Sequence, residues 1–264
     1  MAYFAAPLLL NLAAGSIATS YLELSRFHQD TLIVDALDIA LDTGEGLRVI
    51  YQPLKRLGEL GRPVRFFEAL LRFDLGGYAI SPSRFIPLVL ADSALSQKLD
   101  RFVLDRVSQQ MRRDQSHYAV NLTAASMGDR HLVGEIANIF FGLRSQERLI
   151  LEVIENQRVE ESSLIEALNQ HSRVWLDDVG MEFSNFGAIA TLPVKGLKIH
   201  GSFVKSMIRC RRARAIVRGI FQICQELELS CVAEWVETPY HLEAIALMAV
   251  EFPGLDLWVQ GWGI

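Results

Sequence analysis

One rhythm repeats along the chain from about residue 46 onward, and it limits the possible folds more than any other feature. A short apolar run ends near a polar or charged residue, and a longer stretch with helical periodicity follows it. Each of these runs predicts a β-strand. Eight of them occur: LRVIYQ near Gln52, VRFFEALL around Glu68, YAVNL at Asn121, LILEVIE at Glu152, RVWLDD at Asp177 and Asp178, GLKI at Lys198, SCVAE at Glu234, and LWVQ at Gln260.

The segments between the runs predict helices that connect parallel strands. Residues 96–112, 162–169 and 211–228 are amphipathic and long enough for such crossovers. Eight strand–helix units in 264 residues favour an α/β fold closed into a (β/α)8 TIM-like barrel. An open doubly wound sheet usually has fewer strands and a glycine-rich phosphate turn, which this sequence lacks.

The first part of the chain is uncharged and apolar, yet it does not match a standard targeting segment. Residues 1–22 lack the basic start of a signal peptide, and polar residues interrupt them too often for a transmembrane helix. We therefore predict a helical leader over residues 1–31, packed on a barrel domain that spans residues 32–264. Residues 4–24 are expected to lie between the last and first strands, in place of a closing helix. A membrane role is disfavoured.

Composition excludes several classes of function. A net charge of −5 and a pI near 5.7 argue against DNA or RNA polymers as partners. Three scattered cysteines indicate a reducing, cytoplasmic environment. The motifs typical of zinc proteases, serine hydrolases and nucleotide kinases are absent from the sequence.

Polar residues that end several parallel strands are expected to meet at one mouth of a barrel. Carboxylate and amide oxygens suit hard cations such as Mg²⁺ or Mn²⁺. Two such metals would turn a cluster of acids into a clamp for a phosphodiester, so the pattern favours phosphoester hydrolysis. Lys198, the cation in this set, has two interpretations: it activates the attacking water, or it forms an ion pair that neutralises Asp178.

These residues also resemble a known family, the EAL domains, which are cyclic di-GMP-specific phosphodiesterases named for the Glu-Ala-Leu found here at residues 68–70. The resemblance covers roughly residues 32–264. It is carried by blocks in family order: YQPL at 51–54, EALLR at 68–72, DRFVLD at 100–105, VNLTA at 120–124, LEVIE at 151–155, LDDVG at 176–180, LPVKGLKIHGSFV at 192–204, AEWVET at 233–238 and VQGW at 259–262.

The resemblance implies a barrel with one antiparallel strand, here the first, and hydrolysis of cyclic di-GMP to linear pGpG in bacterial second-messenger signalling. It also assigns roles to residues. The implied ligands of two Mg²⁺ or Mn²⁺ ions are Glu68, Asn121, Glu152, Asp177, Asp178 and Glu234. Lys198 matches the water-activating lysine and Glu155 the glutamate that anchors the loop after the fifth strand, and both count with Glu68 and Glu234 as catalytic. The implied substrate contacts are Gln52, Arg72 and Gln260.

Four departures from the family pattern leave the activity open. Residues 179–182 replace the usual Phe-Gly-Thr-Gly loop, which couples dimerisation to metal binding in the family, so a homodimer through this loop is an expectation. His200 replaces an aspartate, Trp235 a glycine, and Trp262 a tyrosine. The alternatives to an active enzyme are a catalytically weak or inactive cyclic di-GMP receptor and a protein-interaction module.

Overall fold

The structure is a computed structural model that describes residues 25–129, 131–154, 162–180 and 185–264. The predicted leader at residues 4–24 lies outside this part. The described residues fall into two compact units, one within residues 1–50 and 70–106 and the other within residues 51–69 and 107–264. Within the described ranges, no helix combines the length and apolar character needed to cross a membrane.

The described residues of the first unit include helices and the hairpin strand β3. Helix α3 (Arg26–Thr43) begins at Ser25, whose side chain accepts from a backbone N–H of the first turn, and ends at Gly44, which has a φ of 79°. The predicted boundary between residues 31 and 32 falls inside this helix. The other elements that lie wholly in this unit are β3 (Tyr78–Ile80) and α4 (Pro82–Leu90), and α5 (Ser93–Met111) begins here.

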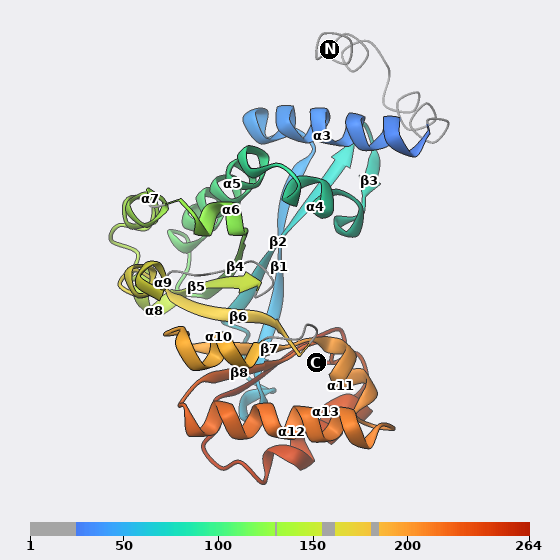
Figure 1. The fold of residues 1–264 in the computed structure, drawn as a ribbon, viewed down its shortest axis with the longest axis vertical. Helices are drawn as coiled ribbons and strands as arrows, with labels where there is room; N and C mark the ends of the chain where they lie inside the picture. The colour runs from blue at the N-terminus through green and yellow to red at the C-terminus, as the bar shows by residue number, and fades with distance from the viewer. Residues whose placement is uncertain (1–24, 130, 155–161, 181–184) are drawn as a thin grey trace. The chain divides into compact units, whose positions relative to one another are not determined.

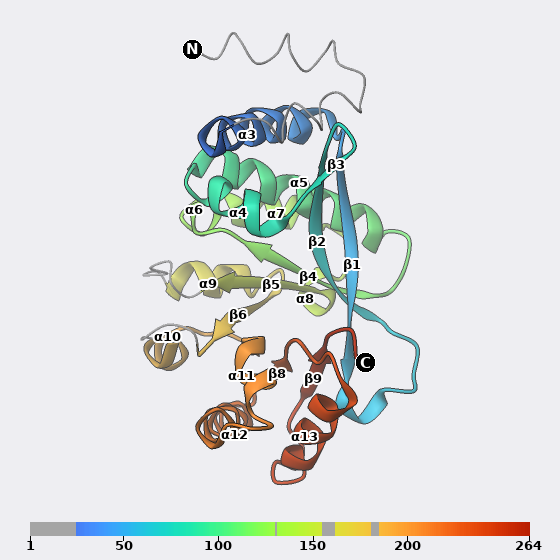
Figure 2. The ribbon, with the colours of Figure 1, turned by 90° about the vertical axis from the view of Figure 1, so that its right-hand side faces the viewer.

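The predicted barrel lies mostly in the second unit, and residues 47–50 and 70–75 of its strands belong to the first. Its strands, which Figures 1 and 2 trace from blue to red, are β1 (Leu47–Arg56), β2 (Phe66–Leu75), β4 (His117–Leu122), β5 (Leu149–Ile154), β6 (Arg173–Val179), β7 (Gly196–Ile199), β8 (Ser230–Ala233) and β9 (Leu257–Gln260). The order is β1-β9-β8-β7-β6-β5-β4-β2, and a β1–β2 pairing closes it. Strand β1 pairs antiparallel with β9, while β2 and β4 to β9 pair parallel, which confirms the predicted fold class.

Helices lie in most of the connections between the strands of the barrel unit. Helix α9 packs on β6, and α12 packs on β7 and β8 (Figure 1). The elements are η1 (Leu57–Glu59), α6 (Ala124–Met127), α7 (Leu132–Ile139), α8 (Ser145–Arg148), α9 (Ser162–Leu168), α10 (Asn185–Thr191), α11 (Gly201–Ser206), α12 (Arg211–Glu226) and α13 (Pro239–Ala249).

An apolar layer fills the barrel interior. Six strands each contribute one buried residue to it, and Trp258 of β9 packs against them: the six are Leu54, Phe66, Ala119, Ile150, Trp175 and Val232. Strand β7 contributes no side chain, because Gly196 pairs with Trp175 across the sheet. A Cβ at Gly196 would lie 2.6 Å from the Trp175 Nε1 atom. The indole therefore occupies the space that a β7 side chain would need.

We predict that Gly196→Ala destabilises the barrel. The added methyl group overlaps a fully buried ring that has no room to retreat, and overpacking of this kind costs about 1–3 kcal/mol. Gly219→Ala is the matched control, since nothing lies within 4 Å of its Cβ on exposed helix α12. The control should stabilise by up to about 1 kcal/mol. Urea unfolding measures both, and an unchanged Gly196→Ala would contradict this packing.

Candidate functional site

A polar layer lies directly beside the apolar layer. Side chains two positions apart on a strand share a face, so an inward-facing core residue fixes the direction of the residue two positions further along. Strand β1 is antiparallel to the others, so on β1 the corresponding residue lies two positions earlier in the sequence. Applied to the apolar layer and to Gly196, this register gives the following set: Gln52, Glu68, Asn121, Glu152, Asp177, Lys198, Glu234 and Gln260.

The strands hold these residues at different depths. Asp177 stands near the end of β6, Gln260 is the last residue of β9 and Glu234 follows β8. Glu68 is the third residue of the ten-residue strand β2, and Lys198 is the third of the four in β7. Glu68 therefore lies well within its strand, whereas the sequence placed it at a strand end, and Lys198 lies one residue from the end of β7. The alternation of the strands brings the set together.

Lys198 is the centre of the layer. Its Nζ atom lies 2.9 Å from Glu152 Oε2, 2.9 Å from Glu234 Oε1 and 3.3 Å from Asp177 Oδ1. Glu68 Oε2 is 3.5 Å away. Lys198 is 1% exposed and Glu152 0%, so water screens these charges poorly. The partner that the ion-pair interpretation named, Asp178, is not among these four.

Two amides orient Glu68. Asn121 Nδ2 donates to Glu68 Oε1 at 2.7 Å, and Gln260 Nε2 donates to Glu68 Oε2 at 2.6 Å. Both carboxylate oxygens are thus held by neighbours on β4 and β9. Gln260 Oε1 and Glu152 Oε1 are buried and have no hydrogen-bond partner within the described part of the chain. A buried oxygen without a donor is costly, so these atoms are available to a bound cation or water.

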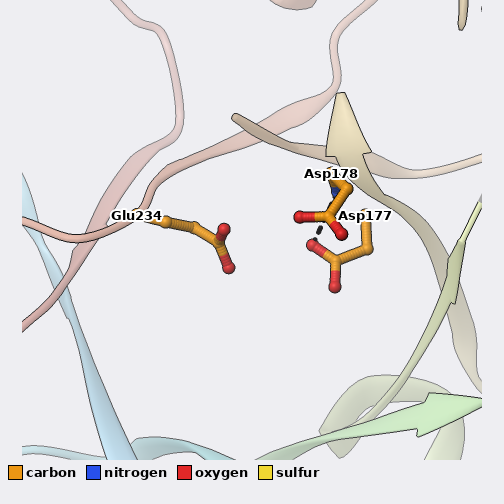
Figure 3. A group of neighbouring side chains, drawn as sticks. All are labelled: Asp177, Asp178 and Glu234. Atoms are coloured by element: carbon orange, nitrogen blue, oxygen red, sulfur yellow. Dashed lines mark hydrogen bonds between the residues drawn. The ribbon is translucent and has the colours of Figure 1, made fainter. Parts of the chain in front are cut away.

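Three acids meet at the edge of the layer. Figure 3 shows Asp177 and Asp178 at the end of β6 and Glu234 across from them, with ligand oxygens within 4.8 Å of one another. Asp178 does not follow the strand alternation. Its φ is 56°, the pairing of β6 with β7 shifts register between Leu176 and Val179, and its backbone N–H donates to Asp177 Oδ1 at 2.9 Å. This irregularity turns the carboxylate of Asp178 toward its neighbours.

Neighbouring groups outweigh the effect of burial on the pKa values of both Lys198 and Glu68. Burial lowers the pKa of Lys198, but Asp177, Glu152, Glu234 and Glu68 outweigh it and leave that pKa well above its ordinary value. Burial raises the pKa of Glu68, yet the charge of Lys198 and the hydrogen bonds from Gln260 and Asn121 bring it below its ordinary value. Without other cations, Lys198 is protonated at neutral pH.

The remaining acids hold protons more tightly than usual. Burial raises the pKa of Glu152 well above its ordinary value and also raises that of Asp177, although Lys198 opposes both shifts. The pKa of Glu234 rises to about 7, first through burial, against the opposing effect of Lys198, and then through Asp177 and Glu68. One lysine therefore does not compensate the acids around it. The donor set consists of oxygens, which suits hard divalent cations, and the residues present fit such ions.

Two of the departures from the family pattern contact each other beside the acids. The rings of His200 and Trp235 lie 4.8 Å apart, and His200 Nε2 is 3.9 Å from Asp178 Oδ1. Trp235 follows Glu234 directly and has a φ of 53°, a conformation that favours glycine. Lys205 Nζ lies 4.7 Å from the Trp235 ring centroid, a contact that nothing in the sequence pattern indicated. The substituted residues thus pack together at the edge of the acidic site.

The other predicted site residues separate into two groups. Gln52 is half-buried on β1, within the polar register, and Arg72 on β2 belongs to the other compact unit, where it donates to the carbonyl of Leu71. Glu155 lies outside the described residues, as do Met181 and Glu182 of the substituted loop. Their roles remain predictions.

Comparisons with known proteins identify relatives of this chain. A family model described as EAL domain matches residues 34–262. The probable cyclic di-GMP phosphodiesterase PdeA of Escherichia coli (strain K12) is 28% identical over 85% of this chain and 31% of that protein. The bifunctional diguanylate cyclase/cyclic di-GMP phosphodiesterase MucR of Pseudomonas aeruginosa is 34% identical over 71% of this chain and 29% of that protein. The chain therefore spans about a third of the length of these two relatives.

Solved structures share the fold. The PaMucR phosphodiesterase in its c-di-GMP complex superposes with a TM-score of 0.76 at 29% identity, over 87% of this chain and 94% of that one. The FimX EAL domain from Pseudomonas aeruginosa, bound to c-di-GMP, gives a TM-score of 0.74 at 23% identity, over 87% of this chain and 93% of that one. The family match extends over most of the residues and includes every strand of the barrel. The chain belongs to the EAL domain family.

Proposed function

We propose that this chain is a metal-dependent phosphodiesterase that hydrolyses cyclic di-GMP to the linear dinucleotide. The observation that carries the proposal is the buried layer of four carboxylates around Lys198, flanked by two amides and by Asp178. Relatives named cyclic di-GMP phosphodiesterases support the same chemistry. The proposal covers this domain, since the curated relatives are longer proteins.

The residues that would hold metal come from five strands or their ends: Glu68, Asn121, Glu152, Asp177, Asp178 and Glu234. Two Mg²⁺ or Mn²⁺ ions bound there would polarise the phosphodiester and lower the pKa of a bound water. Gln260 keeps Glu68 in place through its 2.6 Å hydrogen bond. A residue that orients an acid in this way affects affinity even without touching the metal.

Lys198 has two roles in this proposal. While its four acidic partners carry no other cation, it remains protonated and holds them together. A proton can leave Lys198 only when those acids share their charge with other cations, because their field is what raises its pKa. Lys198 would then accept a proton from the attacking water, in the role predicted from the resemblance. Glu155 is proposed to anchor the neighbouring loop.

The proposed substrate contacts are residues outside the set of proposed metal ligands. Gln52 belongs to the polar register, where an amide can bind a guanine edge or a phosphate oxygen. Arg72 is proposed to pair with a phosphate that no metal touches, since a guanidinium binds two phosphate oxygens at once. Gln260 Nε2 already donates to Glu68, and its Oε1 atom, which has no partner in the described part of the chain, can accept a hydrogen bond from a ligand.

A second candidate function is a receptor that binds cyclic di-GMP and turns it over poorly. The observation that favours it is the packing of Trp235 on His200, which places bulk and a strained backbone next to Glu234. In a receptor the acids would remain while the geometry needed for catalysis is lost. A homodimer through the loop after β6 is part of the first proposal, since that loop connects dimerisation with the metal site in the family.

Purified protein incubated with cyclic di-GMP and Mg²⁺ or Mn²⁺ should release linear dinucleotide, and EDTA should stop the reaction. Glu68→Gln should reduce the rate by at least about 100-fold, because it removes a charged ligand while keeping the shape of the side chain. Chromatography follows the product, and calorimetry follows binding in the same samples.

The matched control is Glu243→Gln, which makes the same change on an exposed position of α13 and should leave the rate unaltered. Binding without product in the unsubstituted protein would select the receptor. Equal rates for Glu68→Gln and the control would show that the acidic layer is not the active site.

Binding of Mn²⁺ gives a test that needs no substrate. Since the pKa of Glu234 is about 7, a proton competes with the metal below neutral pH, and Mn²⁺ affinity should rise as the pH increases from 6 to 8. Glu234→Gln should weaken binding by roughly 10-fold or more and flatten this pH dependence. Paramagnetic resonance of free Mn²⁺ measures the affinity.

Glu243→Gln again serves as the control, and it should keep both the affinity and the pH dependence of the unsubstituted protein. If Glu234→Gln bound Mn²⁺ equally well at both pH values, Glu234 would not belong to a metal site.

A further inference from the structure

A pocket lies at the opposite end of the barrel from the polar layer. It is bordered by the last residues of the antiparallel strand β1, by the first residues of β2 and β4, and by Trp258 near the start of β9. Leu54, Phe66 and Trp258 are also members of the apolar layer. The pocket thus adjoins one side of that layer, and Lys198 and its acids lie on the other side.

The rim of this pocket is basic although the chain is acidic overall. Lys55, Arg56, Arg62 and Arg65 line it, and Glu59 is the acid among the lining residues. Two of the four cations have acidic partners: Arg56 Nε lies 3.1 Å from Asp256 Oδ1 and Arg62 Nη1 lies 3.0 Å from Glu59 Oε1.

Within the described residues, the side chains of Lys55 and Arg65 have no acidic partner. They therefore leave two uncompensated positive charges on the rim, in a chain whose net charge is −5.

The floor of the pocket is aromatic. The rings of Phe66 and Trp258 meet edge to face with centroids 5.2 Å apart, and the ring of Phe66 is tilted against that of His117 at 6.4 Å. Trp258 Nε1 is buried, and the described part of the chain offers it no hydrogen-bond acceptor. A buried donor without a partner carries an energetic cost, which a ligand oxygen or ring nitrogen would relieve.

We infer that this pocket binds a mononucleotide, with the phosphate at Lys55 and Arg65 and the base over Phe66, with its edge toward Trp258 Nε1. A phosphate accepts several charge-assisted hydrogen bonds from such a rim, while a planar base supplies both the apolar face and the acceptor that Trp258 Nε1 needs. The cavity volume of about 370 Å³ is near the lower end of the range for small-molecule sites, which favours one nucleotide over two.

If only the basic rim bound the ligand, inorganic phosphate would bind as tightly as GMP. The contributions of the phosphate and of the base can therefore be tested separately. Calorimetric titrations use GMP, guanosine and inorganic phosphate in EDTA, where the acidic site holds no divalent metal. GMP should bind more tightly than either fragment. Arg65→Ala and Lys55→Ala should each weaken GMP binding by about 10-fold, whereas Arg65→Lys should keep most of it.

Two controls locate the site. Arg211→Ala removes an exposed arginine on α12 and Lys195→Ala removes an exposed lysine, so neither should change GMP binding. Circular dichroism melting confirms that each variant is folded.

The inference fails if GMP does not bind, if phosphate binds as tightly as GMP, or if Arg65→Ala weakens GMP binding no more than Arg211→Ala does. None of these results depends on whether the chain hydrolyses cyclic di-GMP.

Discussion

Four carboxylates that share one buried lysine are the constraint on which the site depends. Two like charges about 4 Å apart repel by roughly 4 kcal/mol at an effective dielectric near 20, and Lys198 compensates one negative charge among four. Burial, followed by repulsion from neighbouring acids, raises the pKa values of Glu152, Asp177 and Glu234. Divalent cations would supply the missing positive charge in place of protons.

The barrel is the means by which distant residues reach this arrangement. Seven strands each contribute one side chain to the apolar layer, β7 has Gly196 at that level, and the residue two positions away on each strand enters the polar layer. The acids are therefore fixed by the same register that packs the core, and a one-residue slip of a strand would turn its acid outward. Asp178 is the exception, and it reaches the site through a bulge and a φ of 56°.

Much of this could be predicted from the sequence, because strand alternation and clustered polar residues leave direct signals. The eight runs correspond to the eight barrel strands, and Glu68, Glu152, Asp177 and Glu234 do meet. The hairpin strand β3 was not predicted, although its two-residue Gly76–Gly77 turn, with φ values of 59° and 89°, is a recognised hairpin signal.

Tertiary contacts left no such signal. That Lys198 pairs with four acids and not with Asp178 depends on strand stagger, which spacing along the chain does not encode. The packing of Trp235 on His200 and Lys205 depends on a left-handed backbone conformation that a tryptophan rarely adopts. The resemblance to the family located these positions, and the structure supplied their contacts.

Thermal unfolding of Lys198→Met in EDTA and in Mn²⁺ tests the shared-lysine account most directly, with Lys195→Met, an exposed lysine nearby in sequence, as the control. The account predicts that Lys198→Met loses several kcal/mol of stability in EDTA, about 3–5 for a broken buried pair, and that Mn²⁺ restores more stability to it than to the unsubstituted protein. Equal melting temperatures in EDTA, or an equal gain from Mn²⁺, would contradict the account.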